Sequence, residues 1–123
     1  MAQSSIENTL MRFSQAWHQK DVDTVVGCFS ERAVYYASVG PLPGEKAVGR
    51  VHIHDLITRM FSHDDGAVSI TEDLAIGKNS ATWKWRYELP DGSSEIGCDF
   101  FTFEGSLIAL KDAYRKVKTE NSE

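Results

Sequence analysis

Two oppositely charged residues, Asp99 and Lys111, stand in neighbouring β-prone runs of the sequence. The runs span 93–103 and 107–115, and the Glu-Gly-Ser segment between them is typical of a hairpin loop. A three-residue loop pairs the two strands so that Asp99 lies directly opposite Lys111. Such a pair offers the chemistry of polarising a carbonyl group or moving a proton.

Asp99 is expected to point into the interior. Side chains alternate between the faces of a strand, so Asp99 shares its face with Phe101 and Phe103, whose size predicts contact with covering helices. A carboxyl group buried there must be protonated, hydrogen-bonded or paired, and Lys111 is within reach. Because Asp99 raises the pKa of Lys111, the lysine is expected to donate a hydrogen bond rather than act as a base. The alternative is a buried ion pair that only fixes the strand register.

Aromatic side chains are expected to surround this pair. In one β-prone run, Trp83, Trp85 and Tyr87 share a face, and this aromatic face must be the covered one. Trp17 lies on a predicted helix, and Tyr35 lies in a separate β-prone run. The hydroxyl of a buried tyrosine needs a partner, so Tyr35 could donate a hydrogen bond to a ligand oxygen. The same spacing is also typical of an ordinary aromatic core.

No metal site and no cofactor are expected. His52 and His54 are two residues apart on a predicted helix, so their side chains point to nearly opposite sides and do not share an ion. Either histidine could still overhang the pocket mouth as a proton carrier. The two cysteines, Cys28 and Cys98, are far apart in the sequence and are interpreted as free thiols.

Hydrophobic periodicity predicts three helices and then a β-meander. Ser4 and Glu7 form a capping box for the first helix, and Asp21 can cap the second. Apolar residues recur every three or four positions in the helical segments, whereas the later runs are β-prone and separated by turn residues. The predicted helices span 5–19, 22–29 and 50–63, and the predicted strands span 33–37, 67–76, 80–89, 93–103 and 107–115.

This order of elements predicts a single α+β domain over residues 1–123, with the helices packed on one face of an antiparallel sheet. The polar tail, 116–123, is expected to fray. The loop from Gly40 to Gly44 is either a lid over a pocket or a plain connector.

Charge and composition exclude several classes of function. With 41% apolar and 25% charged residues, a folded domain is expected. The net charge of -5 has the wrong sign for a protein that holds nucleic acid. No apolar run approaches the roughly 20 residues that span a bilayer, and the N-terminus lacks a basic segment followed by an apolar stretch. We therefore expect a cytoplasmic protein that contacts neither nucleic acid nor membrane.

The other face of the last two predicted strands is too apolar to be left fully exposed to water. Cys98, Phe100, Leu110 and Tyr114 share this outer face. A second copy of the chain would cover it, so we expect a homodimer that forms through the outer sheet face.

The segment Gly-Cys-Asp-Phe-Phe-Thr-Phe-Glu-Gly starts at Gly97, and with the order of elements it resembles the SnoaL-like branch of the nuclear transport factor 2-like superfamily, over about residues 6–116. The resemblance implies a cone-shaped, curved sheet with three helices on its concave face around an apolar pocket. It also implies that Asp99 corresponds to the aspartic acid that ketosteroid isomerase uses as a protonated hydrogen-bond donor to a developing oxyanion.

The resemblance does not carry a named activity to this sequence. The general base of ketosteroid isomerase falls near Ala37 and its oxyanion tyrosine near Phe13, and neither side chain can do those jobs. Polyketide cyclases and limonene epoxide hydrolase place a catalytic aspartate on the final strand, where this sequence has Ala113. The adjacent Asp112 is expected to point outward.

Two functions remain open. The first is a small cofactor-free enzyme, an isomerase, cyclase or dehydratase, that acts on a hydrophobic carbonyl compound through the catalytic residues Asp99, Lys111 and Tyr35. The second is a non-catalytic domain that binds an apolar metabolite or only dimerises, with the ion pair serving the fold. The residues predicted to contact a hydrophobic small molecule are Phe13, Trp17, Ala37, Trp83, Trp85, Phe101 and Ala113.

Overall fold

The helices and strands follow the predicted order, with one short strand added. The structure is a computed structural model, which describes residues 2–64 and 66–118. Its elements are α1 (Ala2–His18), α2 (Val22–Gly27), β1 (Phe29–Tyr36), β2 (Lys46–Val48), α3 (Arg50–His63), β3 (Val68–Ile76), β4 (Ser80–Glu88), β5 (Ser94–Glu104) and β6 (Leu107–Arg115). Within the predicted loose tail, 116–118 form no helix or strand, and 119–123 lie outside the described residues.

The helices bury the apolar faces that their periodicity predicts. On α1 the buried side chains include Ile6 and Leu10, and on α3 they include Ile53 and Ile57. Asp21 caps α2, because its carboxylate accepts a hydrogen bond from the backbone N–H of Thr24 at 3.3 Å.

Two predicted helix boundaries are wrong. α1 begins at Ala2, so Ser4 lies inside the helix and not at its N-cap. α2 ends at Gly27, and Phe29 starts β1 instead of continuing the helix. Strand β1 therefore begins four residues earlier than the predicted run 33–37.

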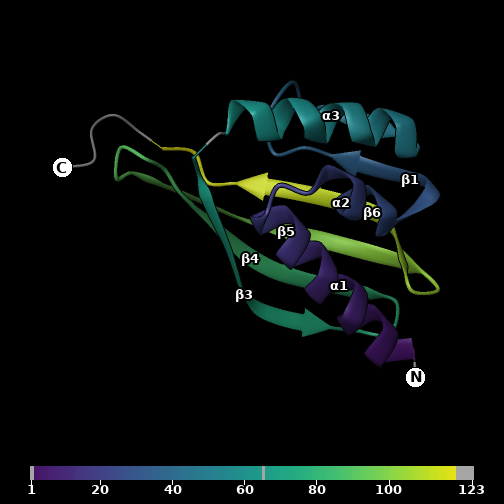
Figure 1. The fold of residues 1–123 in the computed structure, drawn as a ribbon. Helices are drawn as coiled ribbons and strands as arrows, with labels where there is room; N and C mark the ends of the chain where they lie inside the picture. Colours follow the sequence, from purple (N-terminus) through teal and green to yellow (C-terminus); the bar gives the residue numbers. More distant parts are fainter. Residues whose placement is uncertain (1, 65, 119–123) are drawn as a thin grey trace.

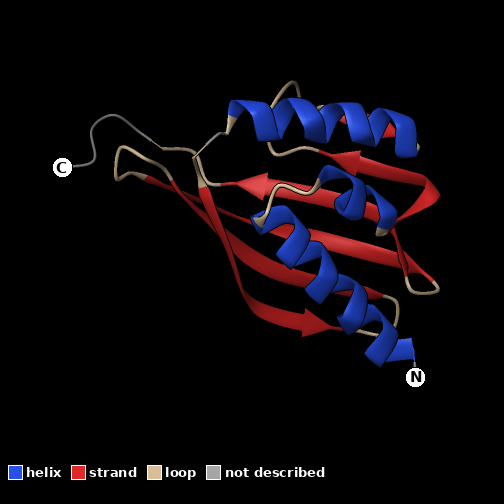
Figure 2. Ribbon diagram, in the orientation of Figure 1, coloured by secondary structure: helices blue, strands red, loops and turns tan. Residues whose placement is uncertain are grey.

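The six strands form one curved sheet in the order β2-β1-β6-β5-β4-β3. The three consecutive hairpins from β3 to β6 are antiparallel, as predicted. Strand β1 pairs with β6 in parallel, so the sheet is mixed and not fully antiparallel. The long chain between β1 and β6 leaves their relative direction free, whereas the short turns of the meander require antiparallel pairing. All three helices lie on one face of the sheet (Figures 1 and 2), which gives the α+β layout.

Side chains alternate along β4 as the sequence predicts. Trp83, Trp85 and Tyr87 are buried beneath the helices, whereas Lys84 and Glu88 are exposed on the other face. The aromatic face of β4 therefore forms a wall of the interior.

The predicted register of the last hairpin is wrong. The loop has two residues instead of three, and an irregularity between Thr102 and Phe103 leaves Ala109 without a cross-strand partner. Each change shifts the register by one residue, so Asp99 lies opposite Ala113 and not opposite Lys111. Because two single shifts restore the original face, the predicted inward side chains still point inward.

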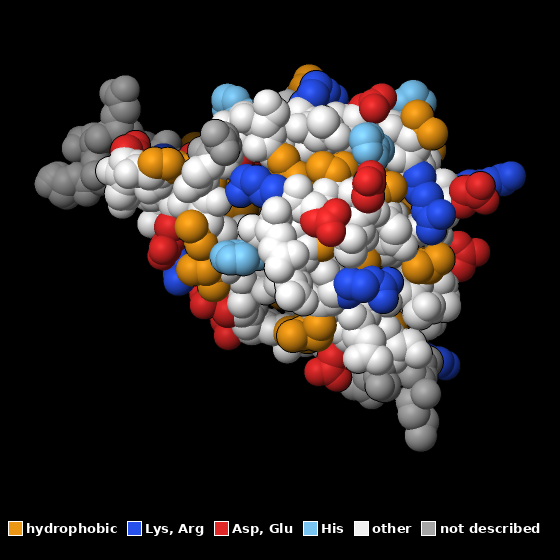
Figure 3. Space-filling view, viewed as in Figure 1, with side chains coloured by type: hydrophobic (Ala, Val, Ile, Leu, Met, Phe, Trp, Pro, Cys, Tyr) orange, Lys and Arg blue, Asp and Glu red, His pale blue; other side chains and the backbone are white. Residues whose placement is uncertain are grey.

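Charged side chains of both signs are interspersed on the helix-covered side of the molecule. In Figure 3, neither lysine and arginine nor aspartate and glutamate gather into a patch of one sign. The described residues on this face therefore form no basic stripe. Among the described residues, no helix combines the length and the apolar character needed to cross a lipid bilayer.

Candidate functional site

Asp99 on β5 and Lys111 on β6 meet inside the molecule. Their exposed fractions are 4% and 3%, and Lys111 Nζ lies 3.2 Å from Asp99 Oδ1. Lys111 is directly opposite Phe101, so its long side chain runs diagonally along the sheet to reach the carboxylate. Both charges are removed from water, and each needs the other and further hydrogen bonds to remain charged there.

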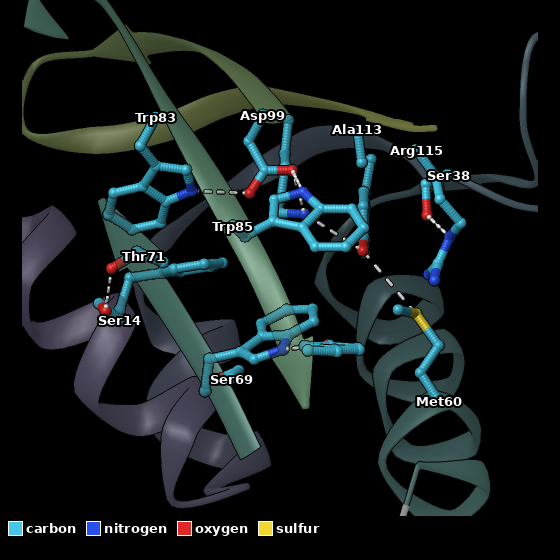
Figure 4. A pocket seen from close by; sticks show the side chains of 15 residues that line it. Ser14, Ser38, Met60, Ser69, Thr71, Trp83, Trp85, Asp99, Ala113 and Arg115 are labelled. Atoms are coloured by element: carbon cyan, nitrogen blue, oxygen red, sulfur yellow. Dashed lines mark hydrogen bonds and ion pairs between the residues drawn. The ribbon is translucent and has the colours of Figure 1, made fainter. Parts of the chain in front are cut away.

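The Asp99 carboxylate accepts hydrogen bonds from two indole groups as well as from Lys111. Trp83 Nε1 donates to Oδ2 at 2.8 Å, and Trp85 Nε1 donates to Oδ1 at 3.2 Å. Both indoles point toward the carboxylate in Figure 4. All three partners are donors, which suits an ionised carboxylate that only accepts. Asp99 thus lacks the protonated donor arrangement that the resemblance to ketosteroid isomerase implies.

Gly97 makes the bond from Trp85 possible. Gly97 lies opposite Trp85 across β4 and β5, and a Cβ atom at this glycine would lie 2.3 Å from the Trp85 ring. Such a contact is far shorter than van der Waals distance, so any larger residue would displace the indole. The absent side chain therefore allows the ring to lie across β5 toward Asp99.

Lys111 links Asp99 to Tyr35. Its Nζ donates to the Tyr35 hydroxyl at 3.3 Å and lies 4.3 Å from the centre of the Tyr35 ring and 5.0 Å from that of Trp17. Burial alone would lower the pKa of Lys111, but Asp99 and Tyr35 outweigh burial and raise that pKa above its usual value. Lys111 is therefore a cation at neutral pH, and an ammonium group is neither a base nor a nucleophile.

Tyr35 on β1 ends this chain of hydrogen bonds. Its hydroxyl accepts from Lys111 and donates to the thioether of Met60, with 3.7 Å between oxygen and sulfur. Burial raises the pKa of the Tyr35 hydroxyl, and the nearby Lys111 cation offsets only part of the rise. The phenol keeps its proton at neutral pH, yet that proton is directed at a weak acceptor.

A cavity of about 30 Å³ lies beside this network. A single water needs about 10–15 Å³ of such volume, so the cavity has room for water. An organic molecule needs many times the volume of a water and does not fit. In the view of Figure 4, Ser14 and Thr71 lie toward one end of the cavity and Met60 and Arg115 toward the other. The lining residues are Phe13, Ser14, Trp17, Tyr35, Ser38, Met60, Ser69, Thr71, Trp83, Trp85, Tyr87, Asp99, Lys111, Ala113 and Arg115.

Two of the predicted contact residues do not line this cavity. Ala37 and Phe101 are buried in the core outside the lining. Tyr87 and Arg115 line the cavity although the sequence analysis did not name them as contact residues. The alternation of side chains along a strand predicts that both point inward, since Tyr87 shares its face with Trp85, and Arg115 shares its face with Lys111.

Other lining residues have no signal in the sequence. Ser14 and Thr71 bond to each other through their hydroxyl oxygens at 2.8 Å, and this contact depends on where α1 crosses β3. Met60 contacts Tyr35 only because α3 lies over β1. Such contacts between distant elements cannot be derived from spacing within one element.

A larger groove of about 950 Å³ lies outside the cavity. It is bordered by residues of α3, of the loop after β1 and of the turn between β4 and β5. Met60, Tyr87 and Arg115 line both the groove and the inner cavity. These three side chains therefore form the boundary between the two spaces. The loop after β1 also borders the groove, through Val39 and Glu45.

His52 and His54 lie at the surface of α3. His54 Nε2 is 3.4 Å from Asp23 Oδ1 at the surface, and His52 is exposed. Neither belongs to the lining of the cavity. Within 2–64 and 66–118, no group of three or more His, Cys, Asp and Glu side chains is placed to hold a metal ion. Cys28 and Cys98 are free thiols.

The comparison with known families identifies one match. Residues 10–111 match the SnoaL-like domain. Among curated proteins, no match is found.

Several solved structures share the fold. An NTF2-like protein of unknown function from Mesorhizobium loti is 22% identical, with a TM-score of 0.82 over 95% of each chain. A candidate polyketide cyclase from Xanthomonas campestris pv. campestris is 15% identical, with a TM-score of 0.71 over 94% of this chain and 93% of that one. A candidate ketosteroid isomerase from Kribbella flavida is 13% identical, with a TM-score of 0.78 over 98% and 84%. At these identities the likeness shows the fold alone.

Proposed function

The chain belongs to the SnoaL-like domain family, and from this premise we propose that it binds a small hydrophobic carbonyl compound and polarises the carbonyl group. The ligand oxygen would accept a hydrogen bond from Tyr35, and the Lys111 cation would lie behind that hydroxyl. The aromatic side chains of Phe13, Trp17 and Trp85, which line the inner cavity, would contact the apolar atoms next to the carbonyl group.

One observation supports the proposal above the others. The Tyr35 hydroxyl is buried, keeps its proton and donates it to the Met60 thioether, which is a poor acceptor. A carbonyl oxygen in place of the sulfur would accept the same proton in a stronger hydrogen bond. The site thus holds a donor whose present partner is weaker than the partner that a ligand would supply.

The charges behind Tyr35 suit the stabilisation of a developing oxyanion. When a carbonyl compound enolises or undergoes aldol-type addition, negative charge grows on its oxygen. Tyr35 would donate to that oxygen, and the Lys111 cation behind it would favour the charge in a site removed from water. Asp99, held by two indoles, keeps Lys111 protonated and in position. The reaction types that fit are isomerisation, aldol-type cyclisation and dehydration.

Acetophenone labelled with carbon-13 at the carbonyl tests this proposal. Binding should move the carbonyl resonance downfield, because a hydrogen bond withdraws electrons from the carbonyl carbon. Tyr35→Phe should reduce that shift and weaken binding about five- to tenfold, the effect of one hydrogen bond. Tyr36→Phe is the matched control, since Tyr36 is only half-buried and follows Tyr35 on the same strand. If Tyr35→Phe and Lys111→Met both leave the affinity and the shift unchanged, the proposal is wrong.

The small volume of the cavity favours a second candidate function. With about 30 Å³ of space, the interior is nearly filled by its own side chains, as expected for a non-catalytic domain whose ion pair serves the fold. This alternative predicts that no carbonyl compound binds inside the molecule. The labelled ketone therefore distinguishes the two functions directly.

We further propose that a second copy of the chain covers the outer face of the sheet. Phe100 and Tyr114 are 48% and 55% exposed, and their rings contact each other edge to face with centroids 5.6 Å apart. Ile96, on the same face of β5, is 42% exposed. An apolar patch of this kind on a regular sheet suits a symmetric contact between two copies.

A further inference from the structure

Met60 stands between the inner cavity and the outer groove. Its side chain lines both spaces, and its sulfur lies 3.7 Å from the Tyr35 hydroxyl. Figure 4 shows the Met60 side chain reaching from α3 toward the site, with its sulfur at the end of a hydrogen bond. A ligand that approached Tyr35 from the groove would meet this thioether first.

The two other boundary side chains are held more firmly than Met60. The Tyr87 hydroxyl accepts a hydrogen bond from Trp17 Nε1 at 2.6 Å. Arg115 donates a hydrogen bond to Ser38 at 3.1 Å and forms an ion pair with Glu95. Its guanidinium carbon Cζ also lies 5.0 Å from the centre of the Trp85 ring. Met60 has a single weak hydrogen bond and an unbranched, flexible side chain. Met60 is therefore the boundary residue that moves at the lowest cost.

The sizes of the two spaces determine how a ligand must lie. The inner cavity of about 30 Å³ holds no organic molecule, whereas the groove of about 950 Å³ is large and open. We propose that Met60 is the specificity-determining residue of this site: an elongated ligand displaces its thioether from Tyr35, places a carbonyl group inside and leaves its body in the groove. This inference rests on the proposed function, because it uses the same donor at Tyr35.

The groove favours a ligand whose body is uncharged. Its apolar lining comes from Val39, Leu56, Leu89 and Pro90. Its two arginines are already paired, Arg59 with Glu45 at 2.8 Å and Arg115 with Glu95. Asp64 and Asp91 add further negative charge to the lining. A carboxylated ligand would meet repulsion there, so the expected class is a neutral, elongated, apolar ketone or aldehyde.

Methyl NMR of methionine can test the displacement directly. The chain has three methionines, Met1, Met11 and Met60, so [methyl-13C]methionine labelling gives a simple spectrum in which Met60→Leu identifies the signal. The probe is 4-acetylbiphenyl, and 4-ethylbiphenyl is the control that matches its shape but lacks the oxygen. The ketone should shift the Met60 methyl signal and leave that of Met11 unchanged, since Met11 is exposed on α1. The hydrocarbon should shift the Met60 signal less than the ketone does, and it should also leave the Met11 signal unchanged.

Two variants measure the cost of displacement. Met60→Ala should bind 4-acetylbiphenyl about tenfold more tightly. This factor corresponds to a wild-type site in which Met60 leaves Tyr35 accessible about a tenth of the time, since the affinity falls by the accessible fraction. Met60→Phe should bind it at least tenfold more weakly, because the rigid ring would fill the passage. Met11→Ala is the control and should leave the affinity unchanged.

The outcomes separate the two proposals. If the ketone binds while the Met60 methyl signal stays in place and both Met60 variants keep the wild-type affinity, Met60 does not determine specificity and the proposed function still stands. If neither wild type nor Met60→Ala binds acetophenone or 4-acetylbiphenyl, the carbonyl-binding function fails and the inference about Met60 fails with it.

Discussion

Removing the charge of Lys111 should destabilise the fold strongly. In Lys111→Met the apolar stem remains, but the Asp99 carboxylate loses its cation while its side chain stays 95% removed from solvent. The two indole donors remain and compensate in part. Breaking a buried ion pair on one side typically costs about 3–5 kcal/mol, which is a large share of the stability of a domain of this size.

The second variant removes both charges. Asp99→Asn with Lys111→Met leaves a neutral amide whose oxygen can still accept from an indole. Because no unpaired charge remains, the double variant should be more stable than Lys111→Met alone by about 2 kcal/mol or more. If the second substitution raises the free energy of unfolding in this way, the two residues form a buried pair whose contributions to stability are coupled.

Urea unfolding at neutral pH, followed by far-UV circular dichroism, measures these differences. Circular dichroism is preferred to tryptophan fluorescence because Trp83 and Trp85 both contact Asp99 and would respond to its environment. Lys84→Met is the matched control, since Lys84 pairs with Asp73 on the same sheet with side chains 68% and 65% exposed. The control should change the free energy of unfolding by less than about 1 kcal/mol. If Lys111→Met costs no more than Lys84→Met, the claim that Asp99 is a buried carboxylate held by Lys111 is refuted.

Two further predictions concern pH and assembly. The pKa values of Lys111 and Tyr35 are both raised in the folded state, from ordinary values of 10.5 and 10.0. Both protons are therefore held more tightly in the folded protein than in the unfolded chain. Their contribution to the free energy of unfolding is complete below the ordinary pKa values and is lost as pH rises through the pKa values of the folded state. Unfolding curves between about pH 9 and pH 11.5 should therefore show falling stability in wild type and a shallower fall in Lys111→Met, and equal slopes would contradict the shifts. For assembly, light scattering at micromolar concentration should give the mass of a dimer for wild type and of a monomer for Phe100→Ser with Tyr114→Ser. Val51→Ser, which removes an exposed apolar side chain from α3, should leave the dimer intact, and a monomeric wild type would exclude the proposed contact.

Much of the fold follows from periodicity within single segments. The helix α3 has the bounds predicted from its apolar spacing, and the three hairpins begin and end within a residue or two of the predicted positions. The sequence does not predict strand β2, because a run of three residues between proline-rich and helical segments carries no periodic pattern. The parallel pairing of β1 with β6 is not predictable either, since no local feature connects two strands so far apart in sequence.

The site follows from the sequence less directly than the fold does. The prediction that Asp99 points inward beside Lys111 used a register that is wrong by two residues, and an even error leaves every side chain on the same face. An error of one residue would have placed Lys111 outside. The contact between Tyr35 and Met60 joins a strand to a helix, and the bond from Trp85 depends on the missing side chain of Gly97. Neither arrangement follows from spacing within one element.

The direction of the hydrogen bonds decides which residue meets a ligand. Asp99 accepts hydrogen bonds from three donors inside the protein, so its carboxylate oxygens already have partners. Lys111 divides its hydrogens between Asp99 and Tyr35, which leaves the Tyr35 hydroxyl as the end of the network that faces an exchangeable partner. Hydrophobic residues of similar size often replace a purely structural ion pair without loss of stability. A double variant that folds normally but no longer binds a ketone would show that ligand binding requires the pair and that folding does not.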